Sequence, residues 1–152
     1  MRTAVDHALR LASLWIAWLM AMVFHVELGL MPLFHGLSPE IESHVAPEKL
    51  PLIFSAMLGY FLLPVGAMVL IAFAASDPAH APRWGFWRAS HFWFSVLYTL
   101  TNIPHLIADI TVPDARSDQI VLMRVLVLIG LLINLEAWRW RREGVDAAVG
   151  MP

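Results

Sequence analysis

Hydrophobic residues occur in four long runs, and each run has about the length needed to cross a lipid bilayer. A hydrocarbon core of about 30 Å is crossed by about 20 helical residues. Runs of this length cover residues 11–31, 52–75, 86–108 and 120–140, and prolines, glycines and aspartates interrupt the segments between them. The pattern predicts an all-α integral membrane protein. We expect a single four-transmembrane-helix bundle with up-down topology and a flexible tail over residues 143–152.

The composition supports this prediction. Hydrophobic residues make up 59% of the 152 residues, charged residues only 14%, and the mean hydropathy is +0.67. Soluble domains carry about 25% charged residues. So few charged residues cannot cover the outside of a soluble domain. We therefore expect the lipid bilayer to cover the outside of this protein.

Charge and motif content exclude several classes of function. The net charge of -2, without any run of basic residues, excludes a nucleic acid as partner. The absence of cysteine excludes disulfides, thiolate metal ligands and thiol nucleophiles. The sequence also lacks a phosphate-binding glycine loop, an H-E-x-x-H motif and the context of a serine nucleophile. The candidate chemistry therefore rests on histidines, carboxylates and other polar groups inside the expected spans.

Basic residues predict the orientation of the bundle. In a four-span arrangement, seven arginines share the side of the chain ends, whereas Lys49 and Arg116 lie on the other side. Because basic residues concentrate on the cytoplasmic side, both termini are expected in the cytoplasm and the protein in the inner (plasma) membrane. All seven tryptophans lie near the same side, and we expect them to form an aromatic belt at the membrane interface.

The third span carries a polar seam, meaning a line of polar residues along one helix face. Each helical residue advances the side-chain direction by about 100°, so six polar positions in this span fall within an arc of about 80°. Lipid offers these groups no hydrogen-bond partner, so the seam should face the other helices. The seam consists of His91, Ser95, Tyr98, Asn102, His105 and Asp109.

Polar residues of different spans share a layer in the outer half of the expected bundle. With a rise of about 1.5 Å per residue, Glu27, Asn102 and Arg124 each lie about 7 Å from the midplane. A charge in the bilayer centre costs at least about 2.5 to 3.5 kcal/mol, so such groups are paired or hydrated. We expect Glu27 to pair with Arg124, with Asn102 and Tyr60 completing the hydrogen bonds. Alternatively, Arg124 extends toward the outer surface.

Histidines are the candidate metal ligands. His25 and His105 belong to the outer halves of the first and third spans, and His35 or Asp109 can add a further ligand. Nitrogen and oxygen ligands suit a non-haem transition metal such as zinc, iron or copper(II). A single haem b held by His25 and His105 is the other cofactor that these positions allow. For His7 we expect a solvated position at the inner interface.

Three functions remain open from the sequence. The leading hypothesis is a small inner-membrane protein whose outward-half polar pocket binds a metal, a cofactor or a small amphiphilic ligand. The alternative is an accessory or assembly subunit of a larger membrane complex, or a homo-oligomer, in which the same groups only lock the helices together. The third is a membrane enzyme that acts on a lipid or quinone. The predicted pocket consists of His25, Glu27, Tyr60, Asn102, His105, Asp109 and Arg124.

Overall fold

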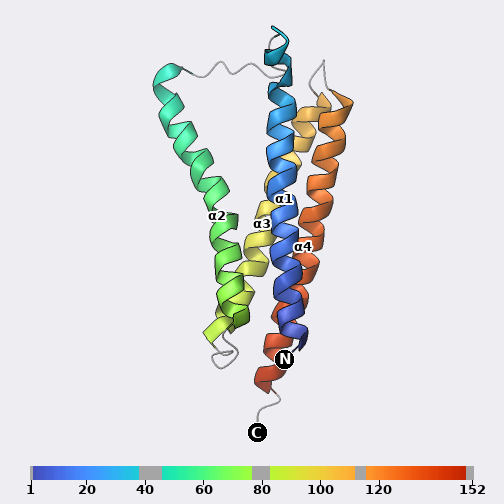
Figure 1. Ribbon diagram of the computed structural model, residues 1–152. Helices are drawn as coiled ribbons and strands as arrows, with labels where there is room; N and C mark the ends of the chain where they lie inside the picture. The colour runs from blue at the N-terminus through green and yellow to red at the C-terminus, as the bar shows by residue number, and fades with distance from the viewer. Residues whose placement is uncertain (1, 38–45, 77–82, 112–115, 150–152) are drawn as a thin grey trace.

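A computed structural model describes residues 2–37, 46–76, 83–111 and 116–149, and four long α-helices account for most of this part of the chain (Figure 1). Each expected span lies inside one of these helices, so the prediction of an all-α four-helix bundle is confirmed. The last helix continues into the segment for which a flexible tail was expected. The helices are α1 (Arg2–Phe34), α2 (Leu50–Ser76), α3 (Arg83–Thr111) and α4 (Ser117–Val149), and a short 3-10 helix, η1 (Pro47–Lys49), precedes α2.

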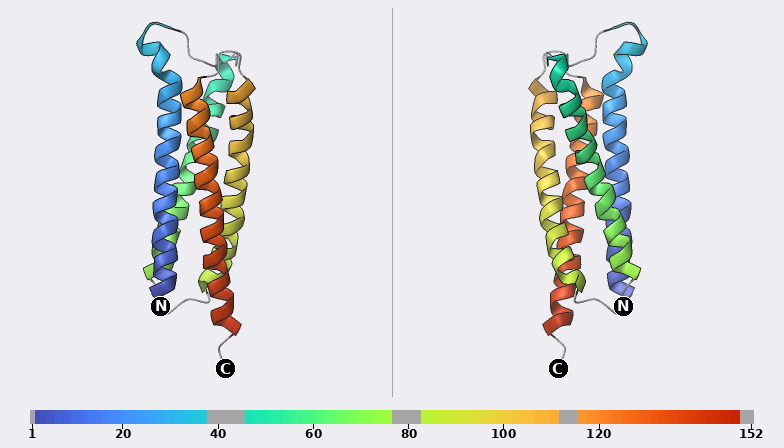
Figure 2. Two further views of the ribbon diagram at one scale, coloured as in Figure 1. Left: turned by 90° about the vertical axis from the view of Figure 1, so that its right-hand side faces the viewer. Right: turned by 90° about the vertical axis from the view of Figure 1, so that its left-hand side faces the viewer.

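Three of the helices stay together along the bundle, while α2 diverges from them. Helix α4 packs against both α1 and α3, and α2 packs against α1 (Figures 1 and 2). The buried residues of α2 all lie in its second half, spaced as one helix face: Pro64, Ala67, Ile71 and Ala74. We call the end where α1 begins and α4 ends the terminal end, and the opposite end the distal end. The start of α2 therefore stands apart at the distal end.

Helix α1 ends at Phe34, and the residues that follow it form a Schellman motif around Gly36. Gly36 has φ 71°, a left-handed conformation that glycine adopts without a side-chain clash. The Gly36 amide donates to the Leu33 carbonyl at 3.2 Å, and the Leu37 amide donates to the Pro32 carbonyl at 3.0 Å. These two bonds are the ones that define this helix end. The sequence therefore turns the chain away from α1 at its distal end.

Arg116 fastens the start of α4 to α1. Pro32 has no N–H, so it cannot bond the carbonyl of Leu28 one turn earlier. The Arg116 Nη1 donates to that Leu28 oxygen at 2.9 Å. Its other nitrogens bond the carboxylate of Asp118. A side chain of α4 thus satisfies a backbone group that proline leaves without its helical partner.

The tryptophans fill the core of the terminal half, and the prediction of a common interfacial belt is wrong for several of them. Trp15, Trp18 and Trp140 are at most 1% exposed, because their rings occupy the space where helices meet. The Trp15 Nε1 donates to the Nε2 of His91 at 3.0 Å, so the buried indole has a polar partner. Trp93 faces outward with 62% exposure, as a belt residue does.

The polar seam of α3 faces the bundle interior, as predicted from its spacing. His91, Ser95, Tyr98, Asn102 and Asp109 are buried, with at most 8% exposure. The remaining member, His105, is exposed. Burial of the seam fixes which side of α3 meets the other helices.

Helix α4 approaches α3 very closely beside this seam. A Cβ atom at Gly130 would lie 2.7 Å from the Thr99 Oγ1, so only glycine fits at the present helix separation. Thr99 donates to the Ser95 carbonyl at 3.0 Å and accepts a hydrogen bond from the Asn134 Nδ2 at 3.0 Å. The contact thus combines close packing with a polar link between the two helices.

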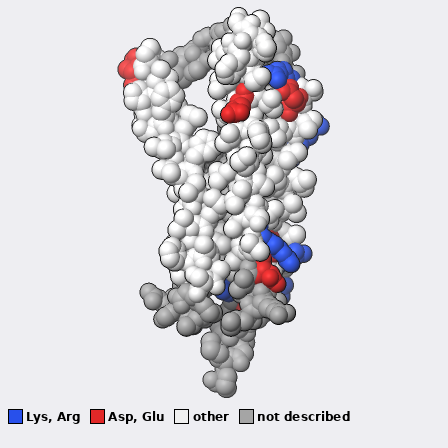
Figure 3. All heavy atoms as spheres, in the orientation of Figure 1, with Lys and Arg blue, Asp and Glu red and all other residues white. Residues whose placement is uncertain are grey.

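The face of the bundle shown in Figure 3 is uncharged in its middle. Lysine, arginine, aspartate and glutamate gather toward the two ends of the face shown in Figure 3, and an uncharged band separates them. Three segments are long and apolar enough to cross a membrane: Asp6–Phe34, Pro47–Ser76 and Ser117–Glu143. Helix α3 is not among them, although its 29 residues provide the length. The molecule is therefore a membrane-type helical bundle with three helices apolar enough to span.

Candidate functional site

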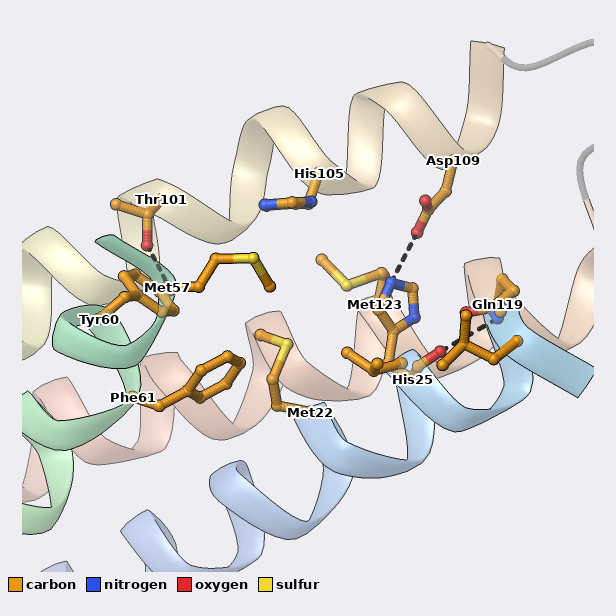
Figure 4. Close-up of a pocket in the computed structure, with 13 residues that line it drawn as sticks. Met22, His25, Met57, Tyr60, Phe61, Thr101, His105, Asp109, Gln119 and Met123 are labelled. Carbon is orange, nitrogen blue, oxygen red and sulfur yellow. Dashed lines mark hydrogen bonds and ion pairs between the residues drawn. The ribbon is translucent and has the colours of Figure 1, made fainter. Parts of the chain in front are cut away.

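A cavity of about 470 Å³ lies in the distal half of the bundle (Figure 4). Helix α2 diverges from the other helices in this half (Figure 1). All four helices contribute side chains to its wall. Ligand pockets for small molecules have volumes of about 300 to 1,000 Å³. The cavity is therefore large enough for a small organic molecule.

A histidine and a carboxylate meet at the distal end of the cavity. The Nε2 of His25 on α1 lies 3.7 Å from the Oδ2 of Asp109 on α3 (Figure 4). The Nε2 of Gln119, in the first turn of α4, donates to the His25 carbonyl at 3.1 Å. Asp109 is only 8% exposed, and its Oδ2 accepts no hydrogen bond within the described part of the chain. This buried oxygen can accept a proton donor from a molecule in the cavity.

Tyr60 and Thr101 line the opposite end of the cavity, and Tyr98 packs against Tyr60 outside the cavity wall. The Thr101 hydroxyl donates to the Tyr98 carbonyl at 2.8 Å, so the Tyr60 hydroxyl donates to the Thr101 Oγ1 at 2.9 Å. The Tyr60 and Tyr98 rings stack with centroids 4.8 Å apart and planes at 18°. The Tyr98 hydroxyl donates to the Tyr60 carbonyl, which Pro64 leaves without an amide donor. These bonds fix the positions of the side chains at the end of the cavity opposite Asp109.

The wall between these two ends is mainly apolar. Met22, Met57, Met123 and Phe61 come from three different helices and turn toward the cavity, and His105 projects into it from α3 (Figure 4). Methionine side chains are flexible and polarisable, so they adapt to ligands of irregular shape. The cavity thus has an apolar middle with a polar group at each end.

The structure brings four of the predicted pocket residues together, namely His25, Tyr60, His105 and Asp109. Asn102 lies outside the cavity wall and is fully buried. Neither polar atom of its side chain has a hydrogen-bond partner among the described residues.

The expected ion pair between Glu27 and Arg124 is absent from the described structure, and both side chains are exposed. Glu27 follows His25 by two positions, which turns it about 200° away on the helix. His25 faces the cavity, so Glu27 faces outward. Arg124 follows the cavity residue Met123 by one position, which turns it about 100° away from that direction, and its side chain is exposed. The prediction relied on depth, which does not fix the direction of a side chain around the helix.

Only some of the residues proposed as metal or haem ligands line the cavity. His25 and His105 both line it, whereas His35 is exposed beyond the end of α1. Among the described residues, no three histidine, aspartate or glutamate side chains lie close enough to hold one metal ion. A metal or haem at His25 and His105 therefore stays a prediction.

Sequence reasoning missed several cavity residues and one polar cluster. Gln119 and Met123 are four residues apart on α4, a spacing that places them on one face and was available from the sequence. At the terminal end, His7 is not solvated as expected. Its Nδ1 lies 2.5 Å from the Glu136 Oε1, and its Nε2 lies 3.0 Å from the Glu143 Oε1. The signal for this cluster was Glu136, the one acidic residue in the predicted span 120–140.

The fold and the cavity define a class, a membrane-type four-helix bundle with an open cavity in one half. No family model matches the chain, and neither a curated protein nor a solved structure is significantly similar to it. The functional argument therefore rests on the geometry of the cavity.

Proposed function

We propose that this protein is a small multi-pass membrane protein that binds a small amphiphile in its distal cavity. The observation that carries the proposal is that the distal cavity has a half-buried histidine beside a buried carboxylate at one end and a mainly apolar wall next to them. Such a division of polar and apolar groups matches a molecule with a polar head and an apolar body. A molecule of uniform polarity would leave one part of this wall without suitable contacts.

The polar end favours a head group that donates a hydrogen bond. The Asp109 Oδ2 is buried and accepts no hydrogen bond within the described chain. A buried polar atom that makes no hydrogen bond costs about 1 to 3 kcal/mol, and a ligand hydroxyl or amine would recover this free energy. His105 stands farther along the same wall and offers a second polar contact.

The apolar middle of the cavity favours an aliphatic or ring-shaped body. Met22 and Phe61 line it together with Val26 and Leu30. Val26 is 42% exposed and Met57 is 46% exposed, so this wall is open where α2 diverges. The opening lies within the apolar part of the surface, which supports entry from the bilayer. An amphiphile dissolved in the membrane would then reach the site without crossing water.

The proposal also includes the membrane topology expected from the sequence. We take α3 as the fourth span, since its buried seam keeps its polar groups away from lipid. The excess of basic residues at the terminal end supports cytoplasmic termini in the plasma membrane. The cavity would then lie in the outer half of the bilayer.

The test is to purify the protein in a mild detergent, extract the small amphiphiles bound to it and quantify them by mass spectrometry. The wild type should carry one species near equimolar amount. Met57→Trp should reduce its amount about fivefold or more, because overpacking a filled site costs about 1 to 3 kcal/mol. The matched control is Leu58→Trp, since Leu58 is 61% exposed and lies outside the cavity wall.

A second pair of variants tests the polar end. Asp109→Asn should weaken retention of the same species, whereas Asp118→Asn, which alters a carboxylate bonded to Arg116, should not. Circular dichroism checks that each variant keeps its helices. The proposal fails if folded wild type carries only host lipids in proportions that Met57→Trp leaves unchanged.

A further inference from the structure

A second cavity, of about 460 Å³, lies between α1 and α4 at the terminal end, well away from the distal cavity. Four leucines form its apolar part, two from each helix: Leu9, Leu14, Leu132 and Leu135. Leu9 is 67% exposed, and Leu132 and Leu135 are each 43% exposed. The groove is therefore an open apolar surface on the side of the bundle.

Two arginines stand beside this groove and are held near each other by one carboxylate. The Nη1 of Arg10 lies 3.5 Å from the Oε1 of Glu136, and the Nη1 of Arg139 lies 3.4 Å from its Oε2. Glu136 is 5% exposed and is also bonded to the Nδ1 of His7 at 2.5 Å. The His7 Nε2 in turn bonds Glu143. A buried and anchored acid thus positions two guanidinium groups.

The two arginines keep most of their hydrogen-bonding capacity. Their side chains are 60% and 50% exposed, and within the described structure each donates one N–H to Glu136 over a long distance. A guanidinium group has five N–H donors in a planar fork. The charged groups of the groove are Arg10, Arg139 and Glu136, so its wall carries a net charge of +1. This wall suits an anion with several oxygen acceptors, such as a phosphate.

The arginines and the leucines of the groove are arranged in the same order as the head group and acyl chain of a lipid in one leaflet. Arg139 lies nearer the terminal end than Leu132 and Leu135 on α4, and Arg10 precedes Leu14 on α1. Toward the middle of the bundle, the charged pair is thus followed by three of the four leucines, while Leu9 lies next to Arg10. A head group with an attached acyl chain matches this order, whereas a free phosphate would leave the leucines uncovered.

We infer that the groove between α1 and α4 binds an anionic phospholipid, with its phosphate on Arg10 and Arg139 and one acyl chain along the leucines. Basic pockets between helices on the cytoplasmic side are a recurrent type of site for anionic lipid head groups. The inference is independent of what the distal cavity binds, because the two cavities share no residue. The ordering of both arginines by Glu136 distinguishes this site from general attraction to a charged membrane.

The test is native mass spectrometry of the full chain in detergent with equal amounts of phosphatidylglycerol and phosphatidylcholine of identical acyl chains. The wild type should retain phosphatidylglycerol in excess. The variant Arg10→Gln/Arg139→Gln should lose this preference, by about fivefold for each arginine. Arg124→Gln removes an exposed arginine of the distal half and should keep the preference.

A variant with intact charges tests the acyl-chain part of the site. Leu132→Trp should reduce phosphatidylglycerol retention, because the larger side chain fills the groove. Leu128→Trp is the matched control one turn earlier on α4, at a position that is 56% exposed and outside the groove. Equal retention of both lipids by the wild type, or a preference that survives the double arginine substitution, would overturn the inference. A dimer that Leu132→Trp dissociates would also overturn it in favour of a second copy.

Discussion

At Pro32 and Pro64, side chains of neighbouring helices bond the carbonyl that the proline leaves without its helical partner. Pro64 cannot donate to the Tyr60 carbonyl, and the Tyr98 hydroxyl on the neighbouring helix bonds that oxygen instead. Tyr98 also stacks against Tyr60, which lines the cavity at the end opposite Asp109. One side chain therefore joins α2 to α3 and shapes the candidate site.

This arrangement predicts that Tyr98→Phe destabilises the protein only while Pro64 is present. The variant should lose about 1 to 3 kcal/mol of unfolding free energy, because it leaves a carbonyl without a partner. In a Pro64→Ala background the new alanine amide can bond that carbonyl, so the same substitution should cost much less. Unfolding in mixed detergent and dodecyl sulfate, followed by circular dichroism, measures both costs. Equal costs in the two backgrounds would show that the bond is not the cause.

Sequence reasoning at the residue scale succeeded where spacing determined direction. The seam on α3 fixed which way Asp109 and Asn102 point, and both are buried. No such pattern exists on α1, whose spanning segment is apolar on most sides, so depth alone could not choose between His25 and Glu27. The structure turns His25 inward and Glu27 outward. The rotation of a helix about its own axis is set by packing with its neighbours, which a list of positions does not contain.

At the scale of elements, the number and order of the helices followed from the apolar runs, but the full lengths of α1 and α4 and the path of α2 did not. Helix α2 is apolar throughout, so its sequence does not distinguish a packed half from a divergent half. The packed half contains the small residues Ala67 and Ala74, which allow close approach. The tryptophans were also ambiguous, since an indole ring suits both a membrane interface and a core.

Helix α3 is the element whose membrane crossing most needs a test. The chain has no cysteine, so single cysteines can be introduced at Ser76, which ends α2, and Thr111, which ends α3. Both positions are exposed. A membrane-impermeant maleimide should label Thr111→Cys in intact cells and Ser76→Cys only after permeabilisation. Labelling of both from the same side would mean that α3 does not cross.

At the scale of the whole molecule, the two halves of the bundle have different packing. Large aromatic rings such as those of Trp15, Trp18 and Trp140 fill the terminal half. Helix α2 diverges in the distal half, and the methionine-lined cavity forms there. The closed half holds the helices in register, and the open half leaves room for a ligand. This difference is the structural basis of the proposed function.

The most direct test of ligand binding is photo-crosslinking from inside the cavity. A photoreactive benzoylphenylalanine that replaces Phe61 would face the cavity. The same group at Leu62, which is 55% exposed and outside the cavity wall, would face the surrounding lipid. Irradiation in native membranes followed by intact-mass spectrometry should give one dominant adduct mass at position 61 and a spread of bilayer-lipid masses at position 62. The same spread of lipid masses at both positions would contradict the proposal that the cavity selects a particular amphiphile.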